Sequence, residues 1–142
     1  MVLDSGSGFN PEIHLLPEVY ARMGFDVIAV DENPLSLSMP HREGVTRVLG
    51  DIRNLPYLDK GADAWVCIST LEHMSRMDKA MTVREGYRVL KPGGLAVITT
   101  DETEPTEIMG LLEAVGFQGG PIDPVVGVML TPRVAWAIAK KP

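Results

Sequence analysis

The sequence predicts one α/β domain built on a mostly parallel β-sheet. Short apolar runs alternate along the chain with segments whose apolar residues recur at helical spacing, the pattern of a parallel sheet covered by helices. The first run, Val2-Leu3, ends in Asp4 and is followed by Gly6 and Gly8. Glycines after a strand let backbone N–H groups approach a nucleotide closely, although a turn that merely needs flexible residues is the alternative.

The elements of the first half follow from periodicity and turn residues. A helix is expected to begin near His14, because Pro17 is tolerated in a first turn, and to end at Gly24. The residues expected on its buried face are Leu15, Leu16, Val19, Tyr20 and Met23. The near-continuous apolar run at 25–31 predicts a strand covered on both faces, and 46–49 predicts a shorter strand after a helical turn.

The second half predicts two central strands, two helices and a terminal hairpin. Apolar runs predict strands at 63–68 and 95–99. Helical spacing predicts helices at 77–90, stopped by Lys91-Pro92-Gly93-Gly94, and at 105–116. The apolar segments 125–130 and 134–140 flank a Thr-Pro-Arg turn and predict an antiparallel hairpin.

Composition narrows the class of protein. A chain of 142 residues with 45% hydrophobic residues suits one domain, and no apolar run approaches the ~20 residues of a membrane helix. Asp4 interrupts the first apolar run and no basic segment precedes it, so we expect a cytoplasmic protein without a secretory signal. The single cysteine, Cys67, is expected to be a small buried hydrophobe. The net charge of −6 makes broad, nonspecific binding to nucleic acid unexpected.

Acidic residues stand at the ends of the second and third predicted strands. In open α/β sheets the ligand lies beyond the carboxyl ends of the strands, so the loops after the strands are expected to meet there. Asp31 ends the second strand, where an acid accepts hydrogen bonds from ribose hydroxyls. Asp51 and Ile52 follow the third strand and are placed to contact an adenine. Solvated or capping acids are the alternative for each carboxylate.

Taken in order, the motifs resemble those of class I S-adenosylmethionine-dependent methyltransferases, most closely the small-molecule, methyltransferase-11-like type. The segments that carry the resemblance are Val2-Leu3-Asp4-Ser5-Gly6-Ser7-Gly8, Val30-Asp31, Gly50-Asp51-Ile52, Ser69-Thr70-Leu71-Glu72-His73-Met74, Arg88-Val89-Leu90-Lys91-Pro92-Gly93-Gly94 and Glu113-Ala114-Val115-Gly116-Phe117. The resemblance implies a Rossmann-like sandwich with a seven-stranded sheet of order 3-2-1-4-5-7-6, in which the seventh strand is antiparallel.

The resemblance also implies a cofactor, S-adenosyl-L-methionine, which leaves as S-adenosyl-L-homocysteine. The residues implied to bind it are Asp4, Gly6, Gly8, Asp31, Glu32, Asp51, Ile52, Ser69 and Thr70. Two departures from the family pattern stand out. Asn10 replaces a frequent third glycine, and the chain begins directly at the first strand, without the helices that often cover the site. We therefore expect a single minimal domain, 1–142, whose site is completed by another segment, a partner chain or homodimer, or the substrate itself.

His73 is the candidate general base, because imidazole titrates near neutral pH and the residue follows the fourth strand. A histidine that only caps or packs beside the next helix is the alternative. No metal site is expected, since Glu72 and His73 are adjacent and point apart. No Asn-Pro-Pro-Tyr-type segment of nucleic-acid methyltransferases follows the fourth strand, which favours a small-molecule acceptor.

Two other functions remain open from the sequence. One is a non-catalytic, methyltransferase-like module that binds the cofactor and needs a partner. The other is an NAD-binding oxidoreductase, for which the last glycine of G-x-G-x-x-G is replaced by Pro11 and the chain leaves no room for a substrate domain.

Overall fold

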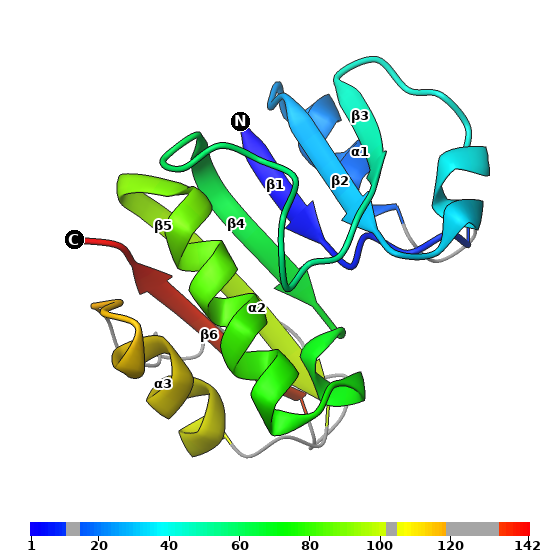
Figure 1. Ribbon diagram of the computed structural model, residues 1–142. Helices are drawn as coiled ribbons and strands as arrows, with labels where there is room; N and C mark the ends of the chain where they lie inside the picture. Colours follow the sequence, from blue (N-terminus) through cyan, green and yellow to red (C-terminus); the bar gives the residue numbers. More distant parts are fainter. Residues whose placement is uncertain (11–14, 102–104, 119–133) are drawn as a thin grey trace.

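The computed structural model describes residues 1–10, 15–101, 105–118 and 134–142 (Figure 1). The strands are β1 (Val2–Ser5), β2 (Val27–Asp31), β3 (Val45–Leu49), β4 (Ala62–Ile68), β5 (Leu90–Asp101) and β6 (Val134–Lys140). The helices are α1 (Leu16–Arg22), α2 (Arg76–Val89) and α3 (Pro105–Ala114), with short 3-10 turns η1 (Pro34–Ser38) and η2 (Leu71–His73).

The described strands form one sheet in the order β3-β2-β1-β4-β5-β6. Neighbouring strands are parallel except β6, which pairs antiparallel with β5. This agrees with the predicted Rossmann-like order 3-2-1-4-5-7. The strand β6 takes the place of the predicted seventh strand, beside β5 and antiparallel to it. Within the described residues the sheet has six strands rather than seven, because the strand predicted at 125–130 lies outside them.

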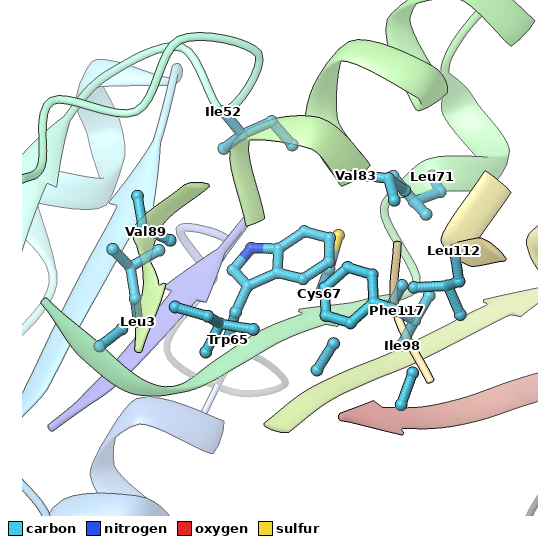
Figure 2. Packing of buried hydrophobic residues seen from close by; sticks show 14 of the residues in the cluster. Leu3, Ile52, Trp65, Cys67, Leu71, Val83, Val89, Ile98, Leu112 and Phe117 are labelled. Atoms are coloured by element: carbon cyan, nitrogen blue, oxygen red, sulfur yellow. The ribbon is translucent and has the colours of Figure 1, made fainter. Parts of the chain in front are cut away.

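The helices cover the two faces of the sheet, with α2 and α3 on one face and α1 on the other (Figure 1). The larger core lies under α2 and α3 and is centred on Trp65, which is fully buried (Figure 2). Gly86 of α2 lies directly over the Trp65 indole, where a Cβ would overlap the ring. Cys67 lies in the same core and is buried, as predicted.

The strand β5 is longer than predicted, because it already begins at Leu90 and includes Lys91-Pro92-Gly93-Gly94. Leu90 pairs with Ala62, and the register shifts before Leu95 pairs with Ala64. Gly93 takes a φ of 81°, which a glycine tolerates without strain. The turn predicted from these residues is therefore an irregularity inside the strand.

The buried face predicted for α1 is wrong except at Tyr20, which packs against the smaller core of Val27, Ala29 and Val45. Leu15, Leu16, Val19 and Met23 are exposed, whereas Pro17 and Glu18 are buried. The physical reason is an ion pair: Glu18 pairs with Arg47 of β3, and both side chains are almost completely buried. Because a buried charge without a partner costs several kcal/mol, this pair fixes which side of the short helix faces the sheet.

No described helix is long and apolar enough to span a lipid bilayer.

Candidate cofactor site

A cavity of about 600 Å³ opens at the carboxyl edge of the sheet, a volume within the range of small-molecule sites. The predicted site residues that line it are Gly6, Gly8, Asp31, Glu32, Asp51, Ile52, Ser69, Thr70 and His73. They come from the loops after β1, β2, β3 and β4. The rule that ligands bind beyond the carboxyl ends of parallel strands thus brings together residues far apart in the sequence.

The glycine turn after β1 forms the floor of the cavity. Gly6 and Gly8 have φ values of 76° and 74°, in the left-handed region that glycine adopts without strain. A Cβ on Gly6 would also clash with the side chain of Thr70 from the neighbouring loop. The N–H groups of Gly6 and Ser7 both donate to the carbonyl of Val30, at 2.9 and 3.2 Å, and this anchors the turn to β2.

Asp31 lies at the end of β2 with both carboxylate oxygens partly engaged. Its Oδ2 accepts a hydrogen bond from the Gly8 N–H at 2.8 Å, and its Oδ1 accepts from the Asn33 N–H at 2.9 Å. A carboxylate has about four acceptor positions. Each oxygen therefore keeps an acceptor position, and together they suit the paired hydroxyls of a ribose.

The loop after β3 carries Asp51, Ile52 and Arg53. The Arg53 guanidinium binds the Asp51 carboxylate in a bidentate manner, with the Nε–Oδ1 and Nη2–Oδ2 distances both 2.9 Å. The hydrogen bonds from Arg53 hold the pKa of Asp51 below its usual value, so this carboxylate is ionised at neutral pH. Ile52 is buried in the core and reaches the cavity only at its edge.

The loop after β4 closes the opposite side of the cavity, across β1 from Asp31. Ser69 has a φ of 45°, a backbone strain that a serine tolerates only where its surroundings hold it. Its N–H donates to the Thr99 carbonyl at 3.0 Å, and the Thr70 hydroxyl donates to the Ile68 carbonyl at 2.9 Å. His73 ends the turn η2 and is exposed at the cavity rim.

Asp4 is the one predicted site residue that does not line the cavity. It is buried in β1, on the sheet face that carries Arg47 and Glu18. Burial raises the pKa of Asp4 to about 7, with Asp31 and Glu18 adding to the effect and Arg47 opposing it. Its predicted contact with the cofactor stays a prediction.

Five residues line the cavity that the sequence had not assigned to the site: Phe9, Arg53, Met74, Ser75 and Asp78. Two of them carried a local signal. Ser75 is the N-cap of α2, and its hydroxyl oxygen accepts from the Asp78 N–H, the pattern of serine followed three residues later by an acid. Arg53 carried none, because an arginine two residues after an acid is equally typical of a solvated loop.

In the part of the chain that the structure describes, no three histidine, cysteine, aspartate or glutamate side chains lie close enough to hold a metal ion. The features that mark the site are its glycine turn and the carboxylates Asp31 and Asp51 after successive strands. In a parallel sheet these features define a nucleoside-binding domain of the Rossmann-like class.

The family model described as a methyltransferase domain, Methyltransf_11, matches residues 3–98, and the chain belongs to this family. The tRNA (carboxymethyluridine(34)-5-O)-methyltransferase of Arabidopsis thaliana is 30% identical over 112 residues, which are 77% of this chain and 26% of that protein. The demethylmenaquinone methyltransferase of Paenarthrobacter aurescens is 36% identical over 99 residues, 68% of this chain and 37% of that protein. The chain thus spans about a quarter to somewhat over a third of these relatives.

The fold has counterparts among solved structures. A TehB-like S-adenosylmethionine-dependent methyltransferase from Corynebacterium glutamicum superposes with a TM-score of 0.81 at 17% identity, covering 99% of this chain and 79% of that one. The cofactor of the family is S-adenosylmethionine. The described residues fit it: Gly6 and Gly8 line the cavity without side chains, Asp31 keeps acceptor positions that suit the ribose, and the loop after β3 suits the base.

Proposed function

We propose that this chain transfers the methyl group of S-adenosylmethionine to a small-molecule acceptor. The observation that carries the proposal is the cavity shared by the glycine turn, Asp31, Asp51 and the loop that ends at His73. Bound S-adenosylmethionine supplies an electrophilic methyl group on a sulfonium. The task left to the protein is to align the acceptor with that methyl and to exclude water, an orientation effect that contributes up to about 7–11 kcal/mol.

Charge supports a small-molecule acceptor rather than a polyanion. Among the described residues that line the cavity, the carboxylates Asp31, Glu32, Asp51 and Asp78 face one arginine, Arg53, and the whole chain carries a net charge of −6. Phosphate groups of a nucleic acid would meet repulsion there. The relative named for demethylmenaquinone agrees with this class of acceptor, whereas the relative named for tRNA is the reason to include tRNA in the test.

The first test is isothermal titration of the chain with S-adenosylmethionine, S-adenosylhomocysteine and NAD in parallel. We expect saturable binding of the first two and none of NAD. Transfer of a labelled methyl group is then measured with a panel of quinols and phenols and, separately, with total tRNA. Binding of NAD in preference to the other two ligands would contradict the proposal, and methylation of tRNA alone would move the acceptor to nucleic acid.

A cofactor-binding module that needs a partner chain is the second candidate. It is favoured by exposed apolar side chains: Phe9, which lines the cavity, is 42% exposed, and Leu35 and Leu37 in η1, the turn after β2, are 56% and 50% exposed. Such groups are typical of surfaces that another chain or a second copy covers. Binding of S-adenosylhomocysteine without any methyl transfer, together with self-association in sedimentation, would favour this candidate. The cytoplasmic location stays a prediction.

His73 is the proposed general base for an acceptor that must lose a proton. In this role its imidazole takes the proton of a hydroxyl or amine acceptor as the methyl is transferred, and His73→Ala is expected to lower kcat by about 100-fold, the lower end of what general bases contribute. Affinity for S-adenosylhomocysteine should stay unchanged, because the rim position of His73 leaves the ribose contacts intact. Full retained turnover across pH 6–9 would remove His73 from the chemistry.

A further inference from the structure

A continuous network of side chains forms one wall of the cavity. It runs from Asp51 in the loop after β3, through Arg53, to Asp78 and Ser75 at the start of α2, and all four residues line the cavity. Arg53 Nη1 donates to Asp78 Oδ1 at 2.9 Å, and the Ser75 hydroxyl donates to Asp78 Oδ2 at 2.7 Å. The network thus joins the loop after β3 to the first turn of α2.

The hydrogen bonds fix the orientation of the Asp51 carboxylate. The backbone N–H of Arg53 donates to Oδ1 at 2.8 Å, and Nη2 donates to Oδ2 at 2.9 Å. The single N–H of Nε is shared between Oδ1 at 2.9 Å and Oδ2 at 3.1 Å, so three N–H groups in all bind this carboxylate. A carboxylate offers about four acceptor positions, so these N–H groups leave about one open. Because the Asp51 side chain is 44% exposed, that remaining position is open to a ligand in the cavity.

From this geometry we infer that Arg53 is a positioning residue for nucleoside recognition: it turns the Asp51 carboxylate so that the cavity presents a single hydrogen-bond acceptor to the base. An acceptor at this place attracts an amino group, as on adenine, and repels a carbonyl oxygen, as on hypoxanthine. Arg53 therefore acts on selectivity through Asp51 rather than by its own contact with the base. The inference rests on the proposed binding of an adenosyl cofactor.

Stability does not account for the network. The Arg53 side chain is 37% exposed and the Asp78 side chain 30%, and ion pairs exposed to this degree contribute little to the free energy of unfolding. Ser75 caps α2 whether or not Arg53 is present, because its oxygen accepts from the Asp78 N–H. Removal of Arg53 should therefore leave the fold intact while it frees Asp51 to rotate.

The test compares the wild-type chain with Arg53→Met, Arg53→Lys and the control Arg84→Met. Arg84 is exposed on the outer side of α2, so its replacement removes the same charge without touching Asp51. Dissociation constants are measured by titration for S-adenosylhomocysteine and for its 6-oxo analogue S-inosylhomocysteine. Thermal unfolding of each variant is followed by circular dichroism.

We expect the wild-type chain to prefer the adenosyl ligand, and Arg53→Met to lower that preference by about tenfold, the effect of one hydrogen bond to a charged acceptor. Arg53→Lys should fall between the two, because an ammonium cannot bind both carboxylate oxygens in the same plane. Arg84→Met and all unfolding midpoints should match the wild type. An unchanged preference in Arg53→Met would overturn the inference alone, whereas a wild-type chain that binds neither ligand would overturn the proposed function with it.

Discussion

Replacing Asp31 with alanine is expected to weaken S-adenosylhomocysteine binding by about 10²–10⁴-fold. Hydrogen bonds to a charged acceptor contribute about 1.5–3 kcal/mol each, so losing both ribose contacts corresponds to about 3–6 kcal/mol. Both oxygens of Asp31 hold an acceptor position beside their bonds to Gly8 and Asn33, which is the geometry that a pair of hydroxyls needs. Isothermal titration measures the change.

A thermodynamic cycle separates recognition of the ribose from support of the glycine turn. Titration of the wild type and Asp31→Ala with the 2′-deoxy and 3′-deoxy forms of S-adenosylhomocysteine completes the cycle. If Asp31 binds the hydroxyls, each deoxy form binds the wild type more weakly than S-adenosylhomocysteine does. The variant should bind the deoxy forms and S-adenosylhomocysteine with nearly equal affinity. Asp26→Ala is the matched control, since Asp26 is an exposed acid at the opposite end of β2. Equal losses with both chains would remove Asp31 from ribose binding.

Replacing Asp4 with asparagine is expected to change how stability depends on pH. Burial raises the pKa of Asp4 to about 7 in the folded chain, whereas an unfolded aspartate titrates near pH ~3.9. Between these values the folded chain binds one more proton than the unfolded chain, so Asp4 lowers stability as pH rises from about 4 to about 7. At about 1.4 kcal/mol per pH unit, ionised Asp4 costs about 4 kcal/mol.

The free energy of unfolding of the asparagine variant should therefore be close to that of the wild type near pH 4.5. At pH 8 the variant should be more stable than the wild type by up to about 4 kcal/mol. Urea unfolding of both chains across this range measures the difference, and Asp26→Asn supplies the control for an exposed acid. Parallel curves for Asp4→Asn and the wild type would contradict the raised pKa. Because the cofactor is cationic, weaker binding of S-adenosylmethionine by the same variant would support the predicted role of Asp4 in the site.

The two glycines and Asp31 could be predicted from the sequence because their signals are local. A left-handed turn needs glycine whatever surrounds it, and an acid at the end of a buried strand marks the edge of the sheet. The strand-end rule also led to Asp51, whereas Ser69 was implied by the family resemblance. The antiparallel last strand came from the family resemblance, since periodicity carries no information on the order of strands in a sheet.

Other features depend on contacts between distant residues. The buried side of α1 is decided by the Glu18–Arg47 ion pair, which no helical pattern in 15–23 reveals. Asp4 pairs with Ala29 of β2, and Ala29 pairs with Arg47 of β3. The burial of Asp4 behind the cavity follows from this position in the register of three strands. The pKa of Asp4 is a consequence of that burial, so only the folded chain determines it.

The sequence by itself determined the class of the domain, the edge of the sheet where the cavity opens and most of the residues that line it. These follow from backbone conformation and strand ends, which short segments specify. The tertiary structure alone decided how the carboxylates are held, since Arg53 meets Asp78 across 25 residues of sequence and turns Asp51 as it does so. The orientation of a side chain depends on the residues that the fold places next to it. Those residues are distant in the sequence, so a local sequence pattern does not reveal them.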